Sequence, residues 1–104
     1  MPLTRAFRET VLEDMKRHAG FREAMLREGI DALLDDDLDL GKSILRDYIN
    51  ATIGFEKLGA KLKMSPKSLM RMFGPKGNPQ AKNLFAVIRV LQNDAGLELH
   101  VAAQ

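Results

Sequence analysis

The sequence contains no cysteine and no tryptophan, and only six of its 104 residues are aromatic. Without cysteine the chain can form no disulfide, no thiolate zinc site and no cysteine nucleophile. No run of 18 or more uncharged apolar residues occurs, so we expect no membrane-spanning helix, and the first residues, MPLTRAFRETV, lack the apolar segment of a secretory signal. These absences and the short length predict a single cytoplasmic domain covering residues 1–104.

The charges are distributed unevenly, although the net charge is only +2, from 16 basic and 14 acidic residues. Residues 1–54 carry 8 basic and 11 acidic side chains, whereas residues 55–82 carry 7 basic side chains and 1 acidic side chain. A local basic surplus is expected where one face of a protein meets phosphates. The alternative is a lysine-rich surface that is only solvated.

Patterns for catalysis and metal binding are sparse. His18 and His100 lie far apart, and neither has a carboxylate or a second histidine at the spacing of metal ligands. No serine has a nucleophile-elbow context, and no glycine-rich phosphate loop follows a strand. The acidic run at 35–37, followed by Asp39, lacks the glycine and distal glutamate of an EF-hand loop, so we interpret Asp37 or Asp39 as the cap of the next helix. We therefore expect no enzyme, no metal and no cofactor.

Apolar residues recur at helical spacing through most of the chain. Gly20 is expected to separate the first two helices, Gly29 to weaken the second, and Gly54 to end the third in a left-handed conformation. The segment at 74–79 holds two glycines and two prolines and is predicted as a loop, with Asn78 as N-cap and Pro79 at the first position of the last helix. The predicted helices span residues 4–17, 21–34, 40–53, 55–62, 66–73 and 79–93.

The last helix is expected to place its apolar stripe inward, and the period changes to two after it. Apolar and polar residues alternate over 97–101, which predicts a strand. A single strand cannot satisfy its own backbone groups, so we expect it to pair with its copy in a homodimer. The residues expected to face inward are Ala81, Leu84, Phe85, Ile88 and Leu91, and those expected to form the dimer contact are Leu97, Leu99, Val101, Val87 and Val90.

The segment from Phe55 to Gly74 reads FEKLGAKLKMSPKSLMRMFG and has the pattern of a helix-turn-helix. Two short helices that cross closely need a small residue at the crossing, here Gly59, and apolar inner faces. Ser65 is a good N-cap for the second helix, and Pro66 suits its first turn. The apolar positions are Leu58, Leu62, Met64, Leu69 and Met72. Together with the basic surplus, this pattern predicts DNA binding.

The run from Arg46 to Val101 resembles the Xre/Cro-like regulators and, among them, the addiction-module antidote proteins. The resemblance rests on LGAKLKMSPKSLMRM, the loop FGPKGNP, the helix NLFAVIRVLQ and the terminal LELHV. Two positions depart from the family pattern. Lys63 replaces a common turn glycine, so we expect a less sharp turn, and Phe55 replaces a glutamine that touches the DNA backbone in many members.

The resemblance implies an all-α, lambda-repressor-like fold, here with two extra N-terminal helices and a short C-terminal β-strand. It also implies a homodimer that represses its own operon as the antitoxin of a type II toxin–antitoxin module, with a small ribonuclease-type toxin as partner. The expected organisation is a helical extension at 1–38, a DNA-binding core at 40–95 and a dimerisation strand at 97–101.

The outer side of the second short helix carries the side chains expected to meet double-stranded DNA. Arg71 is the best candidate for a guanine edge, Lys67 could reach a base or a phosphate, and Ser65 or Ser68 could donate to a phosphate. The full set of expected DNA-binding residues is Ser65, Lys67, Ser68, Met70, Arg71, Lys76, Asn78, Lys57 and Lys61.

Two other functions remain open on the sequence. A helical protein-binding module could bind a toxin through its acidic first half without binding DNA. An RNA-directed protein is less favoured because stacking aromatic residues are few. Salt-dependent DNA binding separates the first alternative from a DNA-binding regulator.

Overall fold

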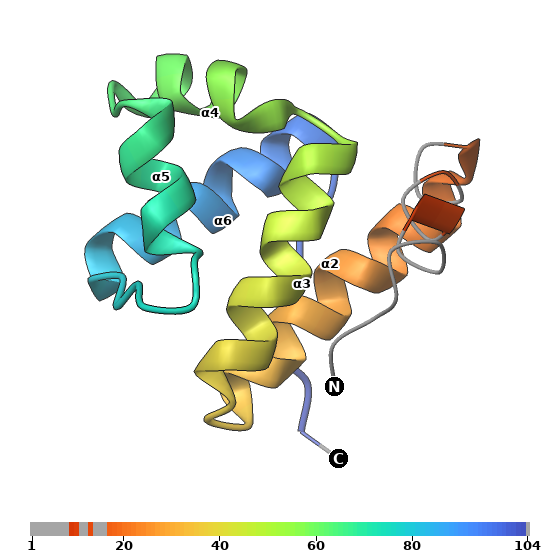
Figure 1. The fold of residues 1–104 in the computed structure, drawn as a ribbon. Helices are drawn as coiled ribbons and strands as arrows, with labels where there is room; N and C mark the ends of the chain where they lie inside the picture. Colours follow the sequence, from red (N-terminus) through yellow and green to blue (C-terminus); the bar gives the residue numbers. More distant parts are fainter. Residues whose placement is uncertain (1–8, 11–12, 14–16, 104) are drawn as a thin grey trace.

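The computed structural model describes residues 9–10, 13 and 17–103. This part of the chain contains no β-strand, and its all-α prediction is confirmed. In Figure 1 two long helices lie side by side, a third crosses the top of the view, a short one stands at the left and the last passes behind them. None of these helices is long and apolar enough to cross a bilayer, which needs about 20 residues. The helices are α2 (Ala19–Leu34), α3 (Leu38–Ala51), α4 (Gly54–Leu62), α5 (Pro66–Met72) and α6 (Ala81–Ala95).

The core collects fully buried side chains from every one of these helices. Helices α2 and α3 form a pair, α4 contacts α3, α5 and α6, and one continuous apolar cluster joins all of these helices. Complete burial of residues from all five helices makes them one packed unit. The largest of the fully buried side chains are Tyr48, Phe73, Leu26, Leu45, Ile49, Leu58, Leu69, Leu91 and Val87.

The pair α2–α3 depends on two glycines at the helix crossing. A Cβ on Gly29 would lie 2.9 Å from Cδ2 of Leu45, and a Cβ on Gly41 would lie 2.6 Å from Cδ2 of Leu33. Both glycines are buried, so the missing side chains let the two backbones approach. Gly29 was expected to weaken this helix, but α2 continues through it, and the side chain of Leu45 packs where a Cβ on Gly29 would stand.

Helix boundaries near the N-terminus differ from the prediction at one glycine. Most of the helix predicted over 4–17 lies outside the described residues. Helix α2 begins at Ala19 after an extended His18, so Gly20 stands in its first turn and does not separate two helices. The cap predicted for α3 is confirmed at Asp37, whose carboxylate accepts a hydrogen bond of 3.2 Å from the Leu40 N–H.

Gly54 has the predicted left-handed conformation, with φ +80°, but it does not directly end α3 as predicted. Helix α3 ends at Ala51, and Gly54 is the first residue of α4. The side-chain hydroxyl of Thr52 donates to the Tyr48 carbonyl at 2.7 Å, which satisfies one carbonyl at the end of α3. The glycine thus provides the change of direction between the two helices.

Helix α6 begins later than predicted and is rotated about its axis. Its N-cap is Gln80, so Asn78 and Pro79 lie in the preceding loop, which corrects their predicted roles as cap and first helical residue. Val87 is fully buried in the core, whereas Phe85 has 66% of its surface exposed. The expectations that Phe85 points inward and that Val87 lies on an open dimer face are therefore both wrong.

Residues 97–101 do not form a strand in the described protomer. Leu97 and Leu99 pack against the core, and Val101 is 83% exposed. The Leu97 N–H donates to the Gln92 carbonyl at 2.9 Å, and the Leu99 N–H donates to the side-chain Oε1 of Gln92 at 2.8 Å. The apolar residues of the alternating pattern thus pack on helices of the same protomer. Gln92 accepts the two hydrogen bonds that a second strand was expected to accept.

Candidate nucleic-acid interface

Helices α4 and α5 cross closely at Gly59, as predicted. A Cβ on this residue would lie 2.6 Å from the Met64 carbonyl oxygen and 3.5 Å from the Pro66 nitrogen. Leu58 and Leu69 are fully buried beneath the crossing. Because the obstacle is backbone, which cannot rotate away as a side chain can, this position has room only for glycine.

The turn between the two helices is sharp. Lys63 adopts the left-handed conformation, with φ 56° and ψ 43°, and the N–H of Met64 donates to the Gly59 carbonyl at 3.0 Å. The expectation that a lysine here would give a less sharp turn is wrong, because Lys63 takes the conformation that glycine adopts most easily. Met64 is partly buried against the core, so its side chain fills the inside of the turn.

Ser65 caps α5, as predicted. Its Oγ accepts a hydrogen bond of 3.0 Å from the Ser68 N–H and donates one of 2.8 Å to Ser68 Oγ, and Pro66 follows in the first turn. Since Ser65 Oγ is engaged in both roles, the hydroxyl that can still donate outward is that of Ser68. Ser65 therefore orders the start of α5, and Ser68 is the better placed of the two for a phosphate.

Helix α5 has one buried and one exposed side, in the predicted phase. Leu69 is fully buried, and Phe73, just after the helix, is 1% exposed and packs against Phe55 with ring centroids 6.4 Å apart. Phe55 is itself buried, which removes it from any surface contact. The exposed side chains of the helix are Lys67, Ser68, Met70 and Arg71.

The basic surplus of residues 55–82 lies entirely on the surface. All seven basic side chains there are exposed, and none of them forms an ion pair within the described part of the chain. Carboxylates of the described residues therefore do not neutralise these positive charges. Among the residues predicted to bind DNA, Lys57 and Lys61 on α4 and Lys76 and Asn78 in the loop after α5 share this exposure.

The structure adds two polar residues that the sequence analysis did not select. Arg46 and Asn50, on α3, line a groove of about 440 Å³ together with Met70 and Arg71 of α5. The two residues are separated by four positions and therefore share one face of α3. This spacing was visible in the sequence, but nothing local indicated that this face adjoins the exposed side of α5.

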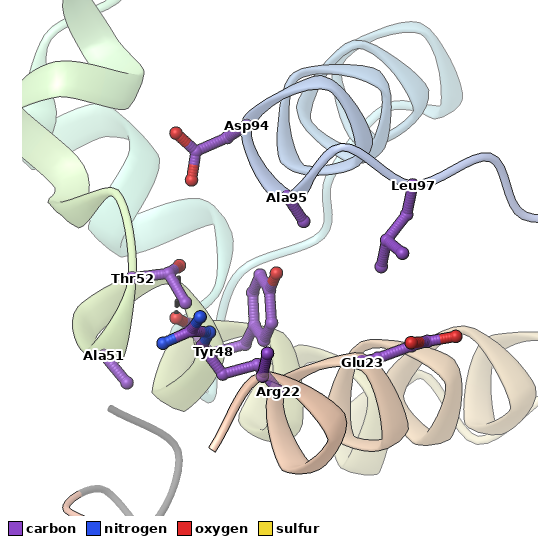
Figure 2. Close-up of a pocket in the computed structure, with 9 residues that line it drawn as sticks. Arg22, Glu23, Tyr48, Ala51, Thr52, Asp94, Ala95 and Leu97 are labelled. Atoms are coloured by element: carbon purple, nitrogen blue, oxygen red, sulfur yellow. Dashed lines mark hydrogen bonds between the residues drawn. The ribbon is translucent and has the colours of Figure 1, made fainter. Parts of the chain in front are cut away.

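A second hollow lies away from α4 and α5, between α2, the end of α3 and the end of α6 (Figure 2). It has a volume of about 390 Å³, and Arg22, Glu23 and Asp94 contribute charged side chains to its lining. The ring of Tyr48 stands in its floor. Burial raises the pKa of Tyr48, the Asp94 carboxylate raises it further, and the Arg22 guanidinium lowers it. At neutral pH this phenol is therefore a neutral hydroxyl.

The surface formed by α5, the exposed side of α4 and the loop 74–79 offers cations and hydrogen-bond donors. These groups suit the binding of a polyanion such as a phosphate backbone. Among the described residues, no three histidine or carboxylate side chains lie close enough together to hold a metal ion. Comparison with models of protein families, with curated proteins and with solved structures finds no match for this chain.

Proposed function

We propose that this chain is a sequence-specific DNA-binding transcriptional regulator in which α4 and α5 act as a helix-turn-helix. The observation that carries the proposal is the two-sidedness of α5. Leu69 is fully buried, while Lys67, Met70 and Arg71 are exposed beside a surface of unpaired lysines. A helix anchored in this way can enter a major groove with its polar side against the bases.

The local geometry of α4 and α5 supports this proposal. A helix-turn-helix joins two short helices through a turn of three or four residues, and here three residues, 63–65, separate Leu62 from Pro66. The glycine crossing at Gly59 and the serine cap at Ser65 fix the second helix relative to the first. In the proposed assignment α3 to α6 form a lambda-repressor-like core.

Each exposed side chain has a proposed role. Arg71 makes a bidentate contact to guanine O6 and N7, the commonest specific contact in the major groove. Lys67 and Arg46 flank it, one on α5 and one on α3. The residues proposed to hold the phosphate backbone and fix the register are Lys57, Lys61, Ser68, Lys76 and Asn78.

Selection from a randomised duplex library tests the proposal. The purified chain is incubated with the library at about 100 mM salt, and retained duplexes are sequenced over successive rounds; we expect one enriched sequence, hereafter the selected duplex. A protein-binding module without DNA function would retain no duplex, even at about 50 mM salt. Enrichment of single-stranded RNA over duplex DNA in a parallel library would favour an RNA-directed protein.

We propose that the regulator is a homodimer, because two recognition helices must lie about 34 Å apart to enter successive major grooves. The apolar surface of α2 and α6 suits this contact better than the predicted strand does. Phe85 and Leu34, 66% and 63% exposed, border two adjoining apolar hollows. Arg27 and Asp31 lie one turn apart along the first of these hollows, so a two-fold axis can bring the arginine of one protomer to the aspartate of its partner.

Replacing Phe85 with glutamine should weaken dimer formation by about tenfold or more, since an exposed aromatic anchor is the residue type that dominates such interfaces. Sedimentation at equilibrium measures the effect, and affinity for the selected duplex should fall with it. Leu40→Gln is the matched control, because Leu40 is 46% exposed at the start of α3 and lines neither hollow. If Phe85→Gln forms the dimer as strongly as the wild type does, Phe85 is not part of the dimer contact.

An autorepressing antitoxin is the form of regulator that we propose. The acidic balance of residues 1–54, with 8 basic and 11 acidic side chains, suits a basic toxin of the small ribonuclease type. The neighbouring gene tests this part directly: a small basic ribonuclease-like protein encoded there, which co-purifies with the chain, would support it. A neighbouring product that does not bind the chain would leave a regulator without a toxin.

A further inference from the structure

Lys42 on α3 is a buried lysine that contacts the loop between α5 and α6. Only 3% of its surface is exposed. Its Nζ donates to the Gly74 carbonyl at 2.9 Å and to the Gly77 carbonyl at 2.6 Å, and the Asp39 carboxylate lies 3.7 Å away. Two of the three ammonium donors are thus hydrogen-bonded to the loop, and the Asp39 carboxylate lies within ion-pair distance.

The loop that Lys42 holds is folded tightly against the end of α5. The Gly74 N–H donates to the Arg71 carbonyl at 3.0 Å, and the Gly77 N–H donates to the Gly74 carbonyl at 3.0 Å. A Cβ on Gly77 would overlap the carbonyl oxygens of Arg71 and Met72. In Figure 1 this loop leaves the lower end of α5 on the side nearer α3 and turns back to the start of α6. One buried cation thus joins α3, the end of α5 and the loop.

The same loop carries an exposed lysine of the proposed DNA surface, Lys76, which lies between the two glycines whose carbonyls Lys42 binds. The loop holds two prolines and two glycines and is not helical. Its shape therefore depends on contacts such as those of Lys42 with the two glycine carbonyls. A loop already fixed before binding loses less conformational entropy when its lysine meets a phosphate.

We propose that Lys42 is a positioning residue for DNA binding, which holds the 74–77 loop so that Lys76 meets the phosphate backbone. This inference rests on the proposed function. Lys42 itself is too deeply buried to touch DNA, so its effect must pass through the loop. A residue that only stabilised the fold would leave the contribution of Lys76 unchanged in the folded molecules.

The first readout needs no DNA. Lys42→Met removes the ammonium group and keeps an unbranched apolar side chain, and it should speed hydrogen exchange at the Gly77 N–H about tenfold while leaving the amides of α2 unchanged. Asp39→Ala is the control, because the Asp39 side chain is 90% exposed and its removal leaves both carbonyl contacts in place. Unchanged exchange at Gly77 in Lys42→Met would overturn the inference and leave the proposed function intact.

The second readout is a double-mutant cycle with the selected duplex. Lys76→Ala in the wild-type background should weaken binding and reduce the salt slope by about one, whereas in the Lys42→Met background it should change neither. Full effect of Lys76→Ala in both backgrounds would show that Lys42 does not position the loop. Failure of the wild-type chain to bind any duplex would instead overturn the proposed function.

Gly77→Ala covers the case in which Lys42→Met does not fold. The added methyl group overlaps the Arg71 and Met72 carbonyls and displaces the loop while Lys42 stays in place. We expect the same loss of the Lys76 contribution to the salt slope. A wild-type slope in folded Gly77→Ala would contradict the link between loop position and phosphate contact.

Discussion

Replacing Leu69 with alanine is expected to lower the free energy of unfolding by about 2–5 kcal/mol. Leu69 is fully buried between α4 and α5, and Cδ1 of its side chain lies 3.6 Å from the position that a Cβ on Gly59 would occupy. The substitution therefore opens a cavity at the helix crossing, where the close approach of Gly59 to the Met64 carbonyl leaves the helices little room to move together and fill it. Chemical denaturation followed by circular dichroism gives the value.

Met70→Ala is the matched control for this prediction. Met70 is the next residue of α5 and is 46% exposed, so its truncation should change stability by no more than about 0.5 kcal/mol. Ser65→Ala should fall between the two, at about 0.5–2 kcal/mol, because it removes the N-cap. A larger loss for Met70→Ala than for Leu69→Ala would mean that α5 presents the opposite face to the core.

Arg71→Ala is expected to weaken binding of the selected duplex by about 5- to 150-fold, which corresponds to about 1–3 kcal/mol. Arg71 is exposed on the outer side of α5, and its proposed bidentate contact reads one guanine. Repeating the selection with the variant should therefore relax the preference at one base pair and keep the others. Unchanged affinity and sequence preference would exclude the proposed docking of α5.

Lys57→Ala provides the contrast with Arg71. Lys57 is exposed on α4 and is proposed to contact a phosphate. Its removal should weaken binding to all duplexes by a similar factor and reduce the salt slope by about one. The two variants thus separate recognition of sequence from contact with the backbone.

Local signals were sufficient to predict α4 and α5. The cap at Ser65, the proline after it and the small residue at Gly59 act within a few residues, and the structure has all three in the predicted roles. The buried phase of α5 follows from Leu69 and Phe73 for the same reason. The candidate surface could therefore be identified largely from the sequence.

The phase of α6 could not be predicted in this way. Apolar residues occupy positions 84–88 and 90–91 almost continuously, so several faces of the helix are apolar and only packing against the other helices decides which is inside. The structure buries Val87 and exposes Phe85. The sequence interpretation made the opposite choice, with Phe85 inside and Val87 on the open side of the helix.

Contacts between distant residues account for the other differences. Lys42 binds carbonyl groups 32 and 35 residues away, and Gly29 makes room for Leu45 on the neighbouring helix. Gln92 supplies its side chain to the Leu99 N–H, which gives the extended C-terminal segment a partner within the protomer. None of these contacts is indicated by the residues nearby in the sequence. The structure was therefore needed to identify the buried lysine, the close helix crossing and the C-terminal segment that forms no strand.

The salt dependence of binding to two duplexes tests the central claim most directly. The affinity of the chain is measured for the selected duplex and for a duplex of the same composition in scrambled order, at salt concentrations from about 50 to 200 mM. We expect both affinities to fall linearly on logarithmic axes, with the selected duplex bound about 10³-fold or more tightly at physiological salt. Equal affinity for the two duplexes, or no binding to either at about 50 mM salt, would contradict the account.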